Sequence, residues 1–102
     1  MTDFNSFFKG FSEQTINSVW NKGYIIPSND SNVVRKDDCG AIIRKSDYGN
    51  TNSKNNSGWE IDHIVPQDKG GSDDLSNLRP LQWFNNRNKS DGELTCPITA
   101  KQ

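Results

Sequence analysis

The segment from Trp59 to Pro66 constrains the fold more than any other part of the chain. Trp59 and Ile61 alternate with polar residues, and Ile64 and Val65 follow them, which is the pattern of a half-buried β-strand. The proline ends the strand because it has no amide hydrogen to donate to a neighbouring strand. The sequence therefore predicts a short strand that carries two polar residues, an aspartate and a histidine, near its end.

A loop, a second strand and a helix are predicted after this strand. Gln67 to Ser76 is polar and contains Gly70-Gly71, which indicates a loop. Leu78 to Leu81 has the character of a short strand, and the proline within it favours an edge position. Gln82 to Lys89 contains no helix breaker and predicts a helix of about two to three turns. The expected order is strand, loop, strand, helix.

The residues before Trp59 predict a helical region and a hairpin. Ser12 is a suitable N-cap for a helix over residues 13–22, which Gly23 would end. The apolar residues of this region recur at helical spacing, which predicts core packing for Phe4, Phe7, Phe8, Phe11, Ile16, Val19 and Trp20. Residues 33–35 and 41–44 flank a polar turn and predict a β-hairpin. Residues 49–58 have no apolar side chain to bury and predict a loop.

Length and charge limit the classes of protein to which the chain can belong. Its 102 residues have room for one small domain with a modest core. The net charge is −1, so the chain lacks the overall basic field of a general nucleic-acid binder, and any such contact must be local. The first residues lack the cationic start and apolar run of a secretory signal, and no stretch has the length of a membrane span. We therefore expect a cytoplasmic chain.

The two cysteines predict neither a disulfide nor a zinc site. Cys39 and Cys96 are far apart in the sequence, and neither belongs to a Cys-x-x-Cys pair. Because a cytoplasmic chain keeps its thiols reduced, we expect two unpaired cysteines that pack or lie at the surface. One histidine and two scattered cysteines cannot easily assemble a four-ligand structural zinc site.

The residue types after position 60 suit phosphodiester hydrolysis, which needs a base for the attacking water and a cation near the developing charge. His63 can be that base, and Asp62 can hold that cation together with the amide oxygen of Asn86, a hard ligand suited to Mg²⁺ or Mn²⁺. Adjacent strand residues point to opposite faces, so both serve one centre only if the strand is kinked or ends there. Pro66 and the glycine loop favour such a departure from regular strand geometry.

These residues and their spacing resemble the HNH endonuclease family, which has the ββα-metal (His-Me finger) fold. The resemblance extends from Trp59 to Lys89 and rests on Ile61-Asp62-His63-Ile64 with Pro66, Gly70-Gly71-Ser72-Asp73, Asn77-Leu78, Leu81, and Asn86-Arg87 with Lys89. It implies that Asp62 and Asn86 bind the metal and that His63 is the general base. It also implies that Asn77 braces the long loop and thereby orients the histidine.

Four basic residues are candidates for substrate binding. Arg87 and Lys89 lie on the predicted helix and are expected to contact phosphates. Arg44 and Lys45 lie in the predicted hairpin, where they could contact phosphates or could be solvated charges of an edge strand.

The chain departs from many members of the family at the positions of a structural zinc. Those members carry a Cys-x-x-Cys pair that binds zinc together with an earlier pair, and the two corresponding positions here are Gln82 and Asn85. The resemblance therefore predicts no structural zinc. Packing of Trp59, Trp83 and Phe84 is expected to replace it.

Taken together, the sequence predicts an α+β single domain over residues 1–102, with an extension over 1–57 and a ββα-metal core at about 58–91. The expected function is that of an HNH endonuclease that hydrolyses phosphodiester bonds in DNA with Mg²⁺, Mn²⁺ or another divalent cation. One alternative is a toxin-type nuclease that acts on RNA or cellular DNA and has an immunity or inhibitor partner. Another is a non-catalytic DNA-binding module of the same fold. No membrane partner is expected, and nothing in the sequence indicates an oligomeric state.

Overall fold

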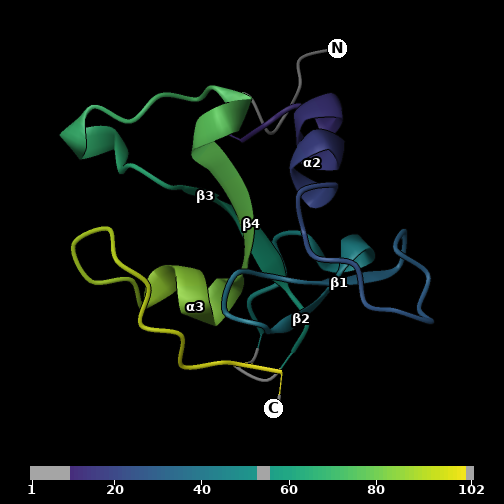
Figure 1. Ribbon diagram of the computed structural model, residues 1–102. Helices are drawn as coiled ribbons and strands as arrows, with labels where there is room; N and C mark the ends of the chain where they lie inside the picture. The colour runs from purple at the N-terminus through teal and green to yellow at the C-terminus, as the bar shows by residue number, and fades with distance from the viewer. Residues whose placement is uncertain (1–9, 53–55, 101–102) are drawn as a thin grey trace.

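The computed structural model describes residues 10–52 and 56–100 (Figure 1). Within these two ranges, the helices are α2 (Glu13–Trp20) and α3 (Trp83–Arg87), and the strands are β1 (Val34–Lys36), β2 (Ile42–Arg44), β3 (Trp59–His63) and β4 (Leu78–Gln82). Three short 3-10 helices join them, namely η1 (Lys45–Asp47), η2 (Gln67–Lys69) and η3 (Leu75–Asn77). β1 pairs antiparallel with β2, and β3 pairs antiparallel with β4, so the predicted α+β class is confirmed. In the described part of the chain, no helix is long and apolar enough to cross a membrane.

The β3–β4 ribbon lies between the two helices (Figure 1). Because side chains alternate along a strand, Trp59 and Ile61 join the core beside α2, whereas Glu60 and Asp62 contact residues on and just after α3. The predicted order of strand, loop, strand and helix is confirmed, and His63 is the last residue of β3. The strand thus ends at the histidine, whose ring lies beside Phe11, whereas the Asp62 carboxylate bonds to Lys89 just after α3.

The hydrophobic core lies between α2 and the β3–β4 ribbon. It consists of buried side chains from four elements, namely Val19, Trp20, Ile43, Trp59, Ile61 and Leu78. The ring centroids of Trp20 and Trp59 lie 5.3 Å apart. Phe11 and Ile16 pack against this cluster, so their predicted core role is confirmed, whereas Phe4, Phe7 and Phe8 lie outside the described residues.

Helix α2 begins as its N-cap predicts and ends earlier than expected. The hydroxyl of Ser12 accepts a hydrogen bond from the amide of Thr15 at 3.1 Å. The helix ends at Trp20 instead of Lys22 because the amides of Lys22 and Gly23 bond to carbonyls only three residues earlier. The predicted hairpin is present as β1 and β2.

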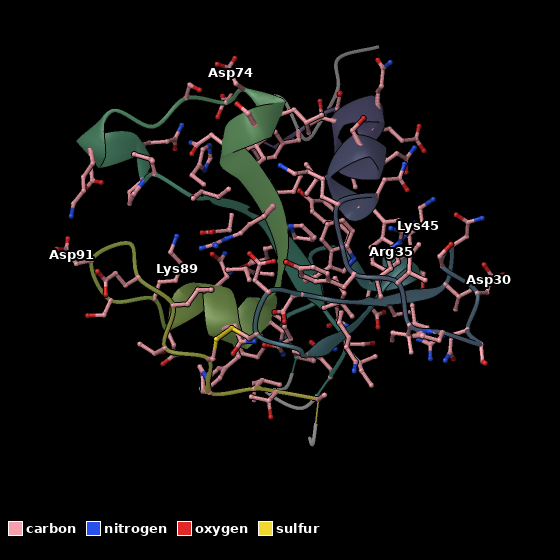
Figure 2. All side chains as sticks on the ribbon, viewed as in Figure 1. Asp30, Arg35, Lys45, Asp74, Lys89 and Asp91 are labelled. Atoms are coloured by element: carbon pink, nitrogen blue, oxygen red, sulfur yellow. A yellow bond between two sulfur atoms is a disulfide. The ribbon has the colours of Figure 1, made fainter. Side chains whose placement is uncertain are left out.

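Cys39 and Cys96 form a disulfide bond, so the expectation of two unpaired thiols is wrong. Their Cα atoms lie 5.3 Å apart at a sequence separation of 57. The C-terminal segment folds back along α3, where Ile98 is buried and exchanges two hydrogen bonds with the side chain of Asn85, at 2.8 and 2.9 Å. The disulfide, drawn as a yellow bond in Figure 2, attaches this segment to the β1–β2 turn.

Candidate functional site

His63 is hydrogen-bonded to Asp73, a residue of the loop that follows β3. The distance from His63 Nε2 to Asp73 Oδ1 is 2.6 Å, and the two side chains are 18% and 67% exposed. The imidazole also lies beside Phe11, with ring centroids 6.0 Å apart. An ionised carboxylate only accepts hydrogen bonds, so Nε2 carries the hydrogen and Nδ1 of the neutral ring has the available lone pair.

Asn77 holds the two ends of the loop that carries Asp73. Its Oδ1 accepts a hydrogen bond from the amide of Val65 at 2.8 Å. Its Nδ2 donates to the carbonyls of Val65 and Ser72 at 3.1 and 2.8 Å, and its backbone carbonyl accepts from the amide of Ile64 at 2.8 Å. These are the contacts expected of a residue that braces the loop.

Two glycines allow the loop to turn back on itself. Gly70 has φ +92°, a left-handed conformation that side chains other than hydrogen disfavour. At Gly71, a Cβ atom would lie 1.7 Å from the carbonyl oxygen of Val65, so only glycine fits. The loop therefore depends on both residues of the Gly-Gly pair.

Asp62 is 4% exposed, and each of its carboxylate oxygens meets a cation. Arg79, directly opposite on β4, donates from Nε to Oδ2 at 2.8 Å and from Nη1 to Asp38 at 3.2 Å. Lys89, just after α3 and labelled in Figure 2, donates from Nζ to Asp62 Oδ1 and to the carbonyl of His63 at 3.1 Å. A buried carboxylate is stable only when its negative charge is paired, so the surroundings of Asp62 favour a positive charge.

Glu60 binds two consecutive residues of α3. Its Oε1 accepts from Asn86 Nδ2 at 2.9 Å and from Arg87 Nε at 3.3 Å, and its Oε2 accepts from Arg87 Nη2 at 2.7 Å. This hydrogen-bonded ion pair raises the pKa of the Arg87 guanidinium. The amide oxygen of Asn86 accepts no hydrogen bond from the residues that the structure describes.

The structure brings together only part of the predicted substrate-binding set. The side chain of Lys89 is 12% exposed and forms an ion pair with Asp62, and the exposed Arg87 forms an ion pair with Glu60. Both cations therefore lie where β3 meets α3. We call this contact the seam; it consists of Glu60, Asp62, Asn86, Arg87 and Lys89. Arg44 is exposed at the end of β2, and Lys45 begins η1. Figure 2 shows Lys45 and Lys89 on different sides of the molecule, so the hairpin pair is not part of this seam.

A protein-family model described as HNH endonuclease matches residues 37–92, more than half of the chain. The chain belongs to the HNH endonuclease family. Members of this family are in general nucleases that act on nucleic acids. No curated protein and no solved structure matches the chain. The match begins well before Trp59, at the turn of the β1–β2 hairpin, and contains every residue of the seam and of the loop.

In this HNH domain, a buried hydrogen-bonded cluster surrounds the two positions at which many family members carry a zinc-binding pair. Oδ2 of Asp37, in the β1–β2 turn, accepts from the amide of Gln82 at 2.9 Å and from Asn85 Nδ2 at 3.1 Å. Its Oδ1 accepts from the amides of Cys39 and Ala41 at 2.9 and 2.8 Å. Burial raises the pKa of the Asp37 carboxyl, although these hydrogen bonds act in the opposite direction.

Of the aromatic residues expected to pack in this region, two contact each other here and one lies elsewhere. Trp83 and Phe84 do pack edge to face, with ring centroids 5.4 Å apart, but Trp59 belongs to the main core beside α2. Gln82 also caps α3, since its Oε1 accepts from the amides of Phe84 and Asn85 at 2.8 and 3.0 Å. The polar contacts of Asp37 and the disulfide therefore occur in this region in addition to the packing of Trp83 and Phe84.

Two residues at the seam between β3 and α3 carry side-chain oxygens that could hold a metal ion. Asp62 offers a carboxylate oxygen and Asn86 an amide oxygen from facing elements. Among the residues described, no group of three or more His, Cys, Asp or Glu could hold a metal ion. Mg²⁺ is usually held by one or two protein oxygens together with water and phosphate oxygens, whereas zinc requires three or four protein ligands. HNH nucleases typically use divalent metal ions.

Proposed function

We propose that this HNH domain is a divalent-metal-dependent endonuclease that hydrolyses phosphodiester bonds in DNA. The observation that carries the proposal is the hydrogen bond between His63 Nε2 and Asp73. It leaves Nδ1 of the neutral imidazole as the nitrogen that can take a proton from the attacking water. A strand that ends in a carboxylate and an oriented imidazole is a suitable place for such a reaction.

In this proposal, His63 is the general base, and two loop residues keep it in position. Asp73 selects the tautomer and orients the ring through Nε2. Asn77 holds the loop that carries Asp73, so it acts on the base without contacting the substrate. The family resemblance implied the bracing role of Asn77 but not the role of Asp73, whose only signal in the sequence was its place in the Gly-Gly-Ser-Asp segment.

The metal would be held by Asp62 and Asn86. A divalent cation there supplies electrostatic stabilisation of the charge that develops on the phosphate and on the leaving oxygen. Arg79 holds the Asp62 carboxylate in place through Oδ2, so its geometry is set before substrate binds. Lys89 and Arg87 are the basic side chains at the seam that would contact backbone phosphates.

A plasmid nicking assay tests this proposal. The wild-type protein should nick supercoiled DNA with Mg²⁺ or Mn²⁺ and should stop when EDTA is added. His63→Ala should lower the rate by about 10² to 10⁴, the usual contribution of a general base. Asp73→Ala should also slow cleavage, whereas the matched variant Asp74→Ala should not, because among the described contacts Asp74 takes part only through its backbone.

Three outcomes would contradict the proposal. Cleavage by His63→Ala within threefold of the wild-type rate would exclude the histidine as base. Cleavage of an RNA substrate in preference to DNA would favour the toxin-type nuclease. Binding of DNA without cleavage under any divalent metal would favour the non-catalytic module. Far-UV circular dichroism of each variant controls for loss of fold.

A further inference from the structure

Glu60 occupies a position that the catalytic scheme above does not use. It precedes Asp62 by two residues on β3, and side chains so spaced on a strand lie on the same face. Glu60 therefore lies beside Asp62 on the side of the ribbon that meets α3. Its side chain is about one-fifth exposed, and from the residues that the structure describes its two oxygens accept three hydrogen bonds, donated by Asn86 and Arg87.

The contact with Asn86 determines which end of that amide is available. The nitrogen of an Asn side chain only donates hydrogen bonds, and its oxygen only accepts them. A carboxylate only accepts, so Glu60 can bind Asn86 solely through Nδ2, at 2.9 Å. This contact leaves Oδ1, the one atom of the amide that can bind a cation, for the seam. A rotation of the amide by 180° would place two acceptors against each other.

Arg87 keeps Glu60 in the orientation that this contact requires. Its guanidinium bonds to both carboxylate oxygens, at 3.3 and 2.7 Å, and such two-point pairing restricts rotation of the carboxylate. Asn86 and Arg87 are consecutive residues of α3, so the same carboxylate also attaches the helix to β3.

We propose that Glu60 is a positioning residue of the metal site, which orients the amide of Asn86 so that its oxygen faces the metal, without being a ligand itself. This inference rests on the proposed function, because it presupposes a divalent cation at Asp62 and Asn86. Residues that hold a metal ligand by hydrogen bonding typically change metal affinity by about 10- to 100-fold when they are removed.

Mn²⁺ binding to the 102-residue chain, measured by calorimetry or electron paramagnetic resonance without DNA, tests the inference. Glu60→Gln and Glu60→Ala lose the same negative charge, but only Glu60→Ala loses the acceptor for Asn86. We therefore expect Glu60→Ala to bind Mn²⁺ at least about tenfold more weakly than Glu60→Gln. Asn86→Ala serves as the reference for a lost ligand. Melting curves without metal show whether either Glu60 variant unfolds. If the two substitutions lower the melting temperature equally, the Mn²⁺ affinities of the two variants can still be compared with each other.

The possible outcomes separate this inference from the proposed function. If wild type binds Mn²⁺ and Asn86→Ala does not, the ligand assignment stands, and equal affinities of the two Glu60 variants would then overturn the positioning role alone. If Glu60→Gln loses Mn²⁺ binding as completely as Asn86→Ala does, Glu60 is itself a ligand, and this result also overturns its positioning role. If wild type binds no Mn²⁺, or if Asn86→Ala retains wild-type affinity, the proposed metal site itself fails.

Discussion

The ammonium group of Lys89 lies against Oδ1 of Asp62, the carboxylate oxygen that Arg79 does not bind. The same ammonium donates to the carbonyl of His63 at 3.1 Å. An internal cation thus neutralises the oxygen that the proposed metal site would use. Lys89 can make both contacts because it lies two residues after the end of α3, next to the end of β3.

Replacement of Lys89 by methionine should strengthen Mn²⁺ binding in the absence of DNA. The variant removes a positive charge that competes with the metal for Asp62, and two charges a few ångströms apart interact by more than about 1.4 kcal/mol at a protein surface, so we expect about a tenfold gain. Lys69→Met is the control, because it removes the same charge from the pair with Asp91. Weaker Mn²⁺ binding by Lys89→Met would show that the lysine assists the site instead of competing for it. The affinity of the Lys89→Met variant for DNA should fall, because the variant lacks a cation that would contact the phosphates.

Asn77→Ala should lower stability and cleavage together. The substitution removes the three side-chain hydrogen bonds that join Val65 to Ser72. Because the loop is partly solvated, water replaces some of them, and we expect a loss of about 1 to 3 kcal/mol in the free energy of unfolding. Cleavage should fall by about 10²-fold, since a displacement of about 1 Å at the base is enough for that loss. Thermal melting and plasmid nicking measure the two effects, with the exposed neighbour Ser76→Ala as control. An unchanged melting temperature with no cleavage would instead place Asn77 on the substrate.

Reduction of the disulfide should destabilise the domain substantially. Closing a loop at a sequence separation of 57 restricts the unfolded chain by about 4 kcal/mol in the loop-entropy model. That is a large fraction of the 5–15 kcal/mol, roughly, by which small domains are stable. We expect a reductant to lower the melting temperature of the wild type to that of the double variant Cys39→Ser with Cys96→Ser. The reductant should leave the double variant itself unchanged. A wild type that melts identically with and without reductant would show that the bond does not contribute.

Asp37 should make the stability of the domain depend on pH in the direction opposite to most carboxylates. Its pKa in the folded state is raised by burial above the ordinary value of 3.8, so the folded state binds the proton more tightly than the unfolded state. Its contribution to the free energy of unfolding therefore rises as the pH falls through the raised pKa toward 3.8, and it levels off below that value. Asp37→Asn lacks this titration, so comparing denaturant unfolding of the two proteins cancels the other carboxylates. The free energy of unfolding of the wild type, relative to that of Asp37→Asn, should increase as the pH falls. A relative free energy that decreases at low pH would contradict a raised pKa of the Asp37 carboxyl in the folded state.

Local sequence patterns were sufficient to predict those features of the fold that depend on residues close together in the chain. The alternation of Trp59 and Ile61 predicted β3, and the hydroxyl of Ser12 predicted the start of α2, whereas the resemblance to the HNH family implied that Asn77 braces the glycine loop. Each of these features depends on backbone geometry and on neighbours close in the chain. The order of elements and the candidate residues Asp62 and His63 followed for the same reason.

Partners distant in the sequence were decided only by the tertiary structure. The sequence could not indicate that Cys39 meets Cys96, that Asp37 accepts from Gln82 and Asn85, or that Glu60 binds α3. Each polar or thiol group has many possible partners of matching chemistry, and the packing of α2 and α3 against the β3–β4 ribbon brings only a few of them within hydrogen-bonding or bonding distance. The chemical character of the site was therefore determined by the sequence, whereas the contacts that orient its side chains were determined by the packing of the chain.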